Sequence, residues 1–298
     1  MAGSARTVLK ATTAAALLAA GATTPAVPQG APTLNLYGTT GLIDMPSGQH
    51  QADGTFNFGV SHFAGITRTT LGFQIAPRIS GSFRYAAVGD WNFGGFKTYY
   101  DRSFDLRFRL VDEGRFLPAV TIGLQDLAGT GLYSGEYIVA TKNLTPRLRV
   151  TAGLGWGRLG SYGAIGSPFG DRPPPDVGQG GVPNWEQWFR GPAAPFGGIE
   201  WQVTDRIGLK VEYSSDAYEV EDGERGIFRR QSPFNFGIEY QANPLTRLGA
   251  YYMYGSEIGV AAHFALDPRV RPVTAGILGP APAPVEPRNL DEPSRATL

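Results

Sequence analysis

The feature that most constrains this chain is an alternation of apolar and polar side chains that recurs between residues 55 and 266. The segment from Phe104 to Leu110 shows it clearly, with apolar residues at every second position and charged residues between them. A period of two places successive side chains on opposite faces of a β-strand. We count twelve such segments, at residues 55–62, 67–75, 79–86, 102–110, 118–126, 136–143, 148–157, 196–203, 207–214, 234–241, 247–254 and 258–266. The pattern predicts an all-β fold.

The connections between these segments are of two kinds, which alternate along the chain. One kind is short and resumes the apolar face with Ile or Leu, as in residues 76–79 and 204–207. The other kind is mostly long, and its longest member spans residues 158–195. Outer-membrane β-barrels have short periplasmic turns and longer extracellular loops. The alternation therefore predicts an antiparallel up-and-down transmembrane barrel of about twelve strands, with up to fourteen allowed.

The charged residues indicate which face of the predicted barrel meets lipid. The apolar positions carry no charge, and a Lys or Arg on the lipid face at mid-bilayer would cost about 2–4 kcal/mol. We therefore predict an apolar exterior against outer-membrane lipid and a polar lumen. The alternative is a soluble β-sandwich whose apolar face is a dry core. The polar side chains expected in the lumen, where they pair with one another or contact a ligand, are Arg68, Arg84, Asp105, Arg107, Arg109, Lys142, Arg149, Glu200, Lys210, Glu212 and Glu239.

Aromatic residues at outward positions gather near the strand ends, as expected for two interfacial girdles. The long-loop end is predicted to hold Tyr85, Trp156, Tyr213 and Tyr254, and the short-turn end Trp201 and Tyr240.

The two ends of the chain lie outside the barrel pattern. Residues 1–22 combine two basic residues, an Ala-rich apolar run and an A-x-A-like site, which predicts a secretory signal peptide. Residues 23–33 are predicted to be a linker and residues 34–266 the barrel domain. Within that domain, residues 34–46 form either an extra wall strand or a segment folded into the lumen. Residues 267–298 are a Pro-rich tail that we expect to be disordered.

No arrangement of residues indicates catalysis. The chain has three His and no Cys, and it lacks the HExxH, GxSxG and Walker motifs. Its formal net charge is zero, which gives no electrostatic reason for nucleic-acid binding. We expect a non-enzymatic protein with no cofactor, metal or nucleic-acid partner. A barrel enzyme that acts on lipid or glycan is the least favoured alternative.

Two predicted loop regions are rich in aromatic residues, whose faces suit stacking on sugars. The first, residues 99–105, stands at a loop–strand junction, and the second lies within the connection 158–195. The alternative is that these residues complete an interfacial girdle and order the loops. The candidate sugar contacts are Tyr99, Tyr100, Asp101, Trp185 and Trp188.

Several stretches match a known family. They include residues 37–47 (YGTTGLIDMPS), 81–85 (GSFRY), 99–105 (YYDRSFD) and 153–160 (GLGWGRLG). On these stretches the chain resembles, in a short form, the YjbH family of exopolysaccharide-associated outer-membrane proteins. The resemblance implies a barrel in the outer membrane of a Gram-negative-type bacterium. It further implies that extracellular polysaccharide and other export components are its partners.

The sequence and the resemblance together lead to one expected function. We expect a non-catalytic outer-membrane barrel that supports exopolysaccharide biosynthesis or export, with polar residues that line or fill the lumen. The alternative is a porin-like or structural barrel with no polysaccharide role.

Overall fold

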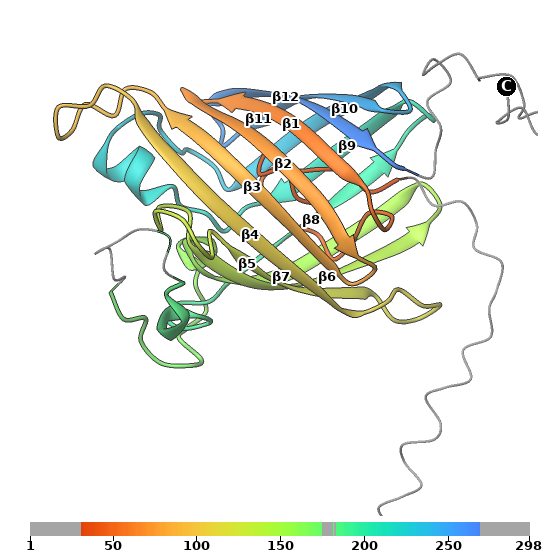
Figure 1. The fold of residues 1–298 in the computed structure, drawn as a ribbon, viewed down its shortest axis with the longest axis horizontal. Coiled ribbons are helices and arrows are strands. Elements are labelled where there is room, and N and C mark those ends of the chain that lie inside the picture. Colours follow the sequence, from red (N-terminus) through yellow and green to blue (C-terminus); the bar gives the residue numbers. More distant parts are fainter. Residues whose placement is uncertain (1–30, 175–180, 182, 269–298) are drawn as a thin grey trace, which may run out of the picture. The chain divides into compact units, whose positions relative to one another are not determined.

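The computed structural model describes residues 31–174, 181 and 183–268. The predicted signal peptide, most of the linker and nearly all of the Pro-rich tail lie outside the described residues. Twelve antiparallel strands form one closed barrel, as predicted (Figure 1). They are β1 (Phe56–Phe63), β2 (Ile66–Ala76), β3 (Ile79–Val88), β4 (Tyr99–Val111), β5 (Ala119–Gln125), β6 (Gly135–Thr145), β7 (Leu148–Gly157), β8 (Ala194–Gln202), β9 (Ile207–Tyr213), β10 (Phe234–Asn243), β11 (Thr246–Met253) and β12 (Glu257–Leu266).

The first and last strands close the barrel. β1 and β12 pair over the full length of β1, from Phe56 opposite Leu266 to Phe63 opposite Gly259. Every strand therefore has two partners, and the sheet has no unpaired edge that could recruit another chain. Both Phe56 and Leu266 lie at the end of the barrel that carries the short turns, which we call the short-turn end.

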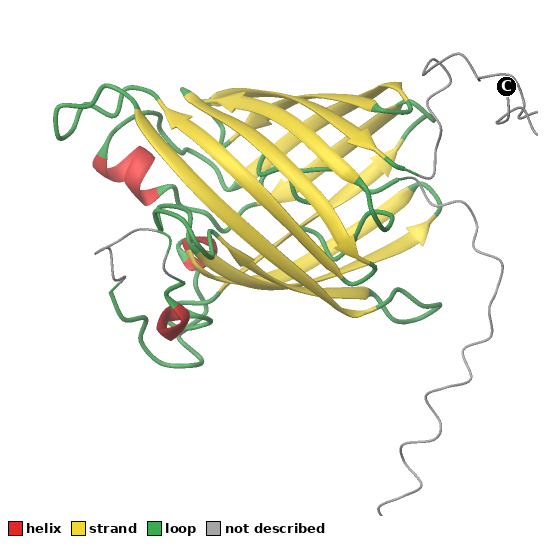
Figure 2. Cartoon of the chain, viewed as in Figure 1, coloured by secondary structure: helices red, strands yellow, loops and turns green. Residues whose placement is uncertain are grey.

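The connections segregate by length as expected, except that the short β1–β2 and β11–β12 connections lie at the end with the long loops. Turns of two residues join β2 to β3, β6 to β7 and β10 to β11 at the short-turn end. The opposite end, called the long-loop end, carries the connections 158–193 and 214–233. Figure 2 shows that the short helical turns lie at that end. They are η1 (Arg158–Gly160), η2 (Trp185–Gln187) and the π-helical η3 (Glu219–Glu224).

Strand β4 shows how the pleat sorts its side chains. Phe104 and Phe108 are exposed on the outside, whereas Asp105 and Arg107 between them are buried inside. The same strand begins at Tyr99, three residues before the predicted start, because Tyr99 pairs with Val88 of β3. An exposed apolar belt of this kind is unfavourable in water and favourable in lipid. Among the described residues, no helix is long and apolar enough to cross a membrane.

Residues 33–50 lie inside the barrel and form what we call the lumen segment (Figure 1). Of the two predicted arrangements for residues 34–46, the segment folded into the lumen is the correct one. Its apolar residues Leu36, Leu42, Ile43 and Met45 are each at most 1% exposed. The barrel interior is therefore a packed core built around the chain's own N-terminal segment.

One predicted girdle residue does not face outward. Alternation would have pointed Tyr254 toward lipid, but β11 ends at Met253 and Tyr254 takes a left-handed backbone conformation, with φ of 54°. Its ring turns into the barrel and packs against Phe63 and Tyr218. The prediction for Tyr254 is therefore wrong, because a single backbone rotation at the strand end reverses the side chain.

Candidate functional site

The lumen contains most of the charged residues that the sequence analysis singled out. Ten of the eleven lie on inward-facing positions, and the exception is Lys142. Thr141 takes the inward position, so Lys142 points outward and pairs across the sheet with Val150. Its ammonium group reaches the carboxylate of Glu113, 2.8 Å away in the β4–β5 turn. A long side chain can thus keep its charge at the membrane surface, and the prediction for Lys142 is wrong. The ten are Arg68, Arg84, Asp105, Arg107, Arg109, Arg149, Glu200, Lys210, Glu212 and Glu239.

Glu212 of β9 holds the turn of the lumen segment. The backbone N–H groups of Ile43, Asp44 and Met45 all donate to its Oε2 atom, at 2.8, 2.9 and 2.9 Å. Asn235 donates from Nδ2 to the other carboxylate oxygen at 2.7 Å. Three successive amides around one oxygen form an anion-binding nest of backbone dipoles. A fully buried carboxylate is thereby satisfied by the segment that it anchors.

Lys210 lies two residues before Glu212 on β9 and binds the same segment. Its ammonium group donates to the carbonyl oxygens of Gly41 and Leu42, at 3.2 and 2.5 Å. It also pairs with Glu239, 2.8 Å away. Because the bonds go to backbone carbonyls, they depend on the path of the chain more than on its side chains.

Arg107 of β4 binds the returning half of the lumen segment. Its guanidinium donates to the hydroxyl of Thr40 and to the carbonyl oxygens of Ser47 and Gln49. Lys210 and Glu212 on β9 and Arg107 on β4 therefore hold the segment from two different strands of the barrel wall.

An arginine pair encloses the ring of Tyr37 in the lumen segment. The guanidinium carbons of Arg68 and Arg84 lie 4.4 and 4.6 Å from the centroid of this ring. Arg84 also pairs with Asp105 at 3.1 Å. Both arginines are fully buried, and cation–π contacts are strongest in such desolvated sites.

A third arginine extends this stack into the long-loop end. Arg158 lies 4.5 Å from the ring centroid of Tyr133 and 4.4 Å from that of Tyr218. It pairs with Asp216 at 2.6 Å and with Glu221 at 3.0 Å. Burial raises the pKa of Asp216 to about 7, although Arg158 opposes that shift. The long loops thus close over the lumen through buried ion pairs.

Asp44 joins the lumen segment to these loops. Its Oδ2 atom accepts hydrogen bonds from the hydroxyls of Tyr218 and Tyr254, at 2.7 and 2.5 Å. The sequence analysis singled out neither Asp44 nor Tyr218, and it placed Tyr254 in the girdle. Asp44 is the only acidic residue among residues 33–50, and that isolated carboxylate was the available signal.

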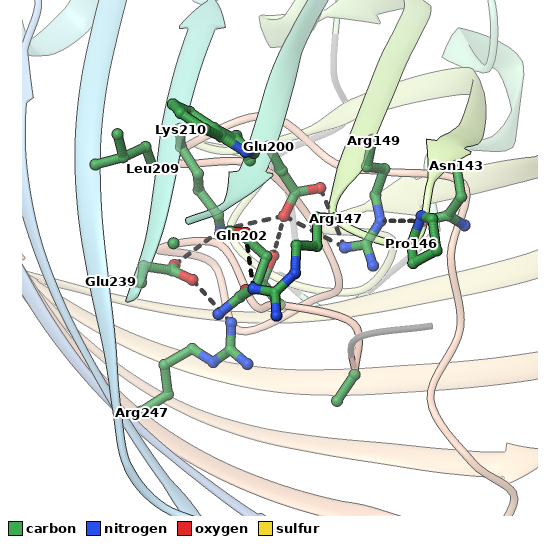
Figure 3. Close-up of a pocket in the computed structure, with 14 residues that line it drawn as sticks. Asn143, Pro146, Arg147, Arg149, Glu200, Gln202, Leu209, Lys210, Glu239 and Arg247 are labelled. Atoms are coloured by element: carbon green, nitrogen blue, oxygen red, sulfur yellow. Dashed lines mark hydrogen bonds and ion pairs between the residues drawn. The ribbon is translucent and has the colours of Figure 1, made fainter. Parts of the chain in front are cut away.

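At the short-turn end an ion-pair chain crosses five neighbouring strands beside a pocket (Figure 3). The pocket has about 390 Å³ of empty volume, including the part open to solvent. The pairs have N–O distances of 3.4, 3.8, 2.8 and 3.2 Å, and they run in the order Arg149, Glu200, Lys210, Glu239 and Arg247. Cationic and carboxylate side chains alternate along this series of ion pairs, so each charge has a neighbour of opposite sign. Among the described residues, no group of acidic, His or Cys side chains could hold a metal ion.

The first group of candidate sugar contacts divides between the two faces of β4. Tyr100 faces outward and stacks on Tyr85, with 5.7 Å between ring centroids. Asp101 is buried and accepts a hydrogen bond from the hydroxyl of Thr130. Tyr99 stacks on Trp91 at 4.5 Å. These contacts match the ordering role weighed in the sequence analysis, and sugar binding by them stays a prediction.

The second group lies in the connection 158–193. Trp185 is exposed and Trp188 is half-buried. They stand on a different element from Tyr99, Tyr100 and Asp101, so the five residues do not share one environment. Their contact with sugar also stays a prediction.

Sequence comparison finds relatives over most of the chain. The family model described as exopolysaccharide biosynthesis protein YbjH, of the family YjbH, matches residues 33–297. An Escherichia coli (strain K12) protein described as the uncharacterized lipoprotein YjbH is 31% identical over 241 residues. The match covers 76% of this chain and 34% of that protein, so the chain spans about a third of the relative's length.

Structure comparison finds outer-membrane barrels of low sequence identity. The KdgM porin has a TM-score of 0.40 and 10% identity, with 72% of this chain and 99% of that chain covered. An outer-membrane channel from Pseudomonas putida F1 has a TM-score of 0.38 and 8% identity, with 75% and 100% covered. Escherichia coli outer-membrane phospholipase A has a TM-score of 0.32 and 9% identity, with 72% and 92% covered. At these identities the likeness concerns the fold alone.

Proposed function

Because the chain belongs to the YjbH family of exopolysaccharide biosynthesis proteins, we propose that it supports the production and export of an extracellular polysaccharide. The protein is an outer-membrane β-barrel of the Gram-negative type, with a closed wall and an apolar exterior. The polymer and other export components would be its partners. The chain itself would carry out no catalytic step.

The filled lumen is the observation that favours a supporting role over a permanently open pore. Leu36, Leu42, Ile43 and Met45 are buried in the lumen. Each buried side chain of this size contributes about 1.5–3 kcal/mol, so the four together contribute roughly 6–12 kcal/mol. Withdrawing the lumen segment would return these side chains to water and would break its bonds to Glu212, Lys210 and Arg107. We therefore propose that the barrel acts in its filled form.

The lumen carboxylates support a non-catalytic role. Glu212 accepts three backbone N–H groups, and Glu239 pairs with Lys210 and Arg247. A general acid or base needs a group that can exchange protons with a substrate, and these carboxylates are occupied by structural partners. Purified protein incubated with phospholipid vesicles or with the polysaccharide is expected to release neither fatty acid nor sugar. Release that disappears in Asp44→Asn would overturn the proposal.

Deletion of the gene tests the polysaccharide role directly. Extracellular polysaccharide is expected to fall in the deletion strain and to return when the wild-type gene is supplied on a plasmid. An unchanged amount of polymer in the deletion strain would refute this role.

Conductance tests the filled lumen separately. Purified protein in planar bilayers is expected to show no steady conductance for small ions. A stable open conductance would favour the porin-like alternative, whatever the polysaccharide measurement gives.

A further inference from the structure

The connection 158–193 covers a part of the barrel exterior that would otherwise meet lipid. Glu136 of β6 and Trp156 of β7 lie opposite each other in the sheet. Both stand at outward positions, two residues from the exposed side chains of Ile138 and Leu154. Yet Glu136 is only 2% exposed and Trp156 only 3%. Another part of the chain must therefore lie on the outside of the barrel at this point.

Aromatic contacts identify that part of the chain. The ring of Trp156 packs edge-on against Phe189, with 5.3 Å between centroids, and lies 6.1 Å from the ring of Phe169. Both phenylalanines belong to the connection 158–193. This connection folds back from the long-loop end onto the outer surface of β6 and β7.

An ion pair fixes the connection to the wall. Arg172 donates to both carboxylate oxygens of Glu136, at 2.7 and 2.9 Å, and the backbone N–H of Phe189 donates to one of them at 3.0 Å. Arg172 also donates to the carbonyl oxygen of Gln187 at 3.0 Å. Bidentate pairs of this kind are strong and geometrically specific. The connection is thus held in place by the one carboxylate that β6 directs outward.

The covered site lies where an aromatic girdle is expected. Trp156 is the outward aromatic residue at the long-loop end of β7, yet it is withdrawn from the surface. In its place the connection exposes Ile165 (71%), Phe169 (63%) and Trp185 (72%). Phe169 adjoins the lipid-facing wall through its contact with Trp156. We propose that the described part of this connection, residues 158–174 and 183–193, is a membrane-contacting surface, and that Phe169 and Trp185 insert into the outer-leaflet lipid in place of Trp156.

Spin labelling tests this surface, because the chain has no Cys and accepts a single label at any chosen site. Phe169→Cys and Trp185→Cys would each be labelled and reconstituted into vesicles of phosphatidylcholine and phosphatidylglycerol. Ile199→Cys, on the lipid face of β8, is the lipid control, and Asp205→Cys, in the exposed β8–β9 turn, is the water control. Collision rates with oxygen and with a water-soluble nickel chelate would be measured for each label.

Labels at residues 169 and 185 are expected to collide with oxygen several-fold more than with nickel, as at residue 199. A nickel-dominated result like that at residue 205 would overturn the proposal and place the surface in water. Low collision rates with both reagents would also overturn it, because they would mean that protein covers the site. Each variant would first be checked for the gel mobility of the folded barrel. If the Cys variants fail to fold, quenching of wild-type fluorescence by brominated lipid, compared with that of Trp185→Phe, decides the question.

Discussion

Replacing Glu212 with Gln tests whether the lumen segment is held by a charged acceptor. The substitution preserves size but leaves one oxygen and one amide in place of two oxygens. If the new side-chain oxygen takes the position that accepts from Ile43, Asp44 and Met45, the new amide must face Nδ2 of Asn235. Asn235 cannot turn to relieve this conflict, because its Oδ1 already accepts the N–H of Tyr254 at 2.8 Å.

The expected loss can be worked from these bonds. Hydrogen bonds to a charged group contribute about 1.5–3 kcal/mol and neutral ones about 0.5–1.5, so three weakened bonds lose roughly 3 kcal/mol. A donor left without an acceptor costs about 1–3 kcal/mol more. Burying a neutral amide is cheaper than burying a carboxylate, which offsets part of the sum. We expect Glu212→Gln to lower the free energy of unfolding by about 2–4 kcal/mol.

Asn235→Asp provides the matched second variant. In the double variant, the carboxylate introduced at position 235 accepts from the amide introduced at position 212 and still accepts the N–H of Tyr254. Every group then has a partner again, and the negative charge has moved by one side chain. We expect the double variant to recover at least half of the loss seen in Glu212→Gln, about 1–2 kcal/mol. Guanidinium unfolding in detergent, followed by tryptophan fluorescence, gives the free energy of unfolding for the wild type, the two single variants and the double variant. No loss in Glu212→Gln, or no coupling to Asn235→Asp, would refute the reasoning.

Three further perturbations test the loops and the carboxylates that anchor them. Arg172→Ala leaves Glu136 buried without its cation. We expect it to destabilise the barrel by about 1–3 kcal/mol and to expose the connection 158–193 to protease. Arg172→Lys keeps the charge but not the bidentate pair, so its effect should be intermediate. Tyr254→Phe removes one of two hydroxyl donors to Asp44 and should cost about 1–2 kcal/mol in unfolding experiments, with no change counting against a stabilising contact. Burial raises the pKa of Asp126 from 3.8 to about 7, so the folded state binds the proton more tightly than the unfolded state. The free energy of unfolding should therefore fall as pH rises from about 4 to about 7, by at most about 4 kcal/mol, and should level off above that range. Asp126→Asn should flatten this dependence. An equal slope in both proteins would contradict the raised pKa of Asp126.

The strands of the barrel wall could be predicted from the sequence, because the side to which a residue points depends only on its position within its own strand. In β4, for example, each residue's face follows from its parity alone, so Asp105 and Arg107 could be assigned to the lumen from the alternation with Phe104 and Phe108. Lys142 also obeys parity, because it lies on the outward side of β6 with Ile138, whereas Thr141 faces the lumen. Its placement in the lumen was wrong because it followed the charge of the side chain and not the position in the strand.

The interior was less predictable because its contacts are distant and use the backbone. Glu212 binds backbone N–H groups, which every residue except proline has. The side chains of residues 43–45 therefore give no sign of the contact. Arg107 and Lys210 likewise bind backbone carbonyls. The resemblance over residues 37–47 marked this stretch without saying what it does. Where Tyr254 points depends on one dihedral angle, which sequence periodicity does not report.

The position of the lumen segment just before β1 has a consequence for how the chain folds. Its bonds to the second half of the barrel include pairs 167 to 210 positions apart, from Met45 with Glu212 to Asp44 with Tyr254. Contacts between such distant residues form late, because the entropy of closing a long loop is lost before they contribute. Arg107 on β4 is present early, but the other residues that anchor the segment lie on β9 and just after β11, so its site is complete only when the last strands have arrived. Closure of β12 onto β1 must then enclose a segment that is already inside, which makes barrel closure and core formation a single cooperative event.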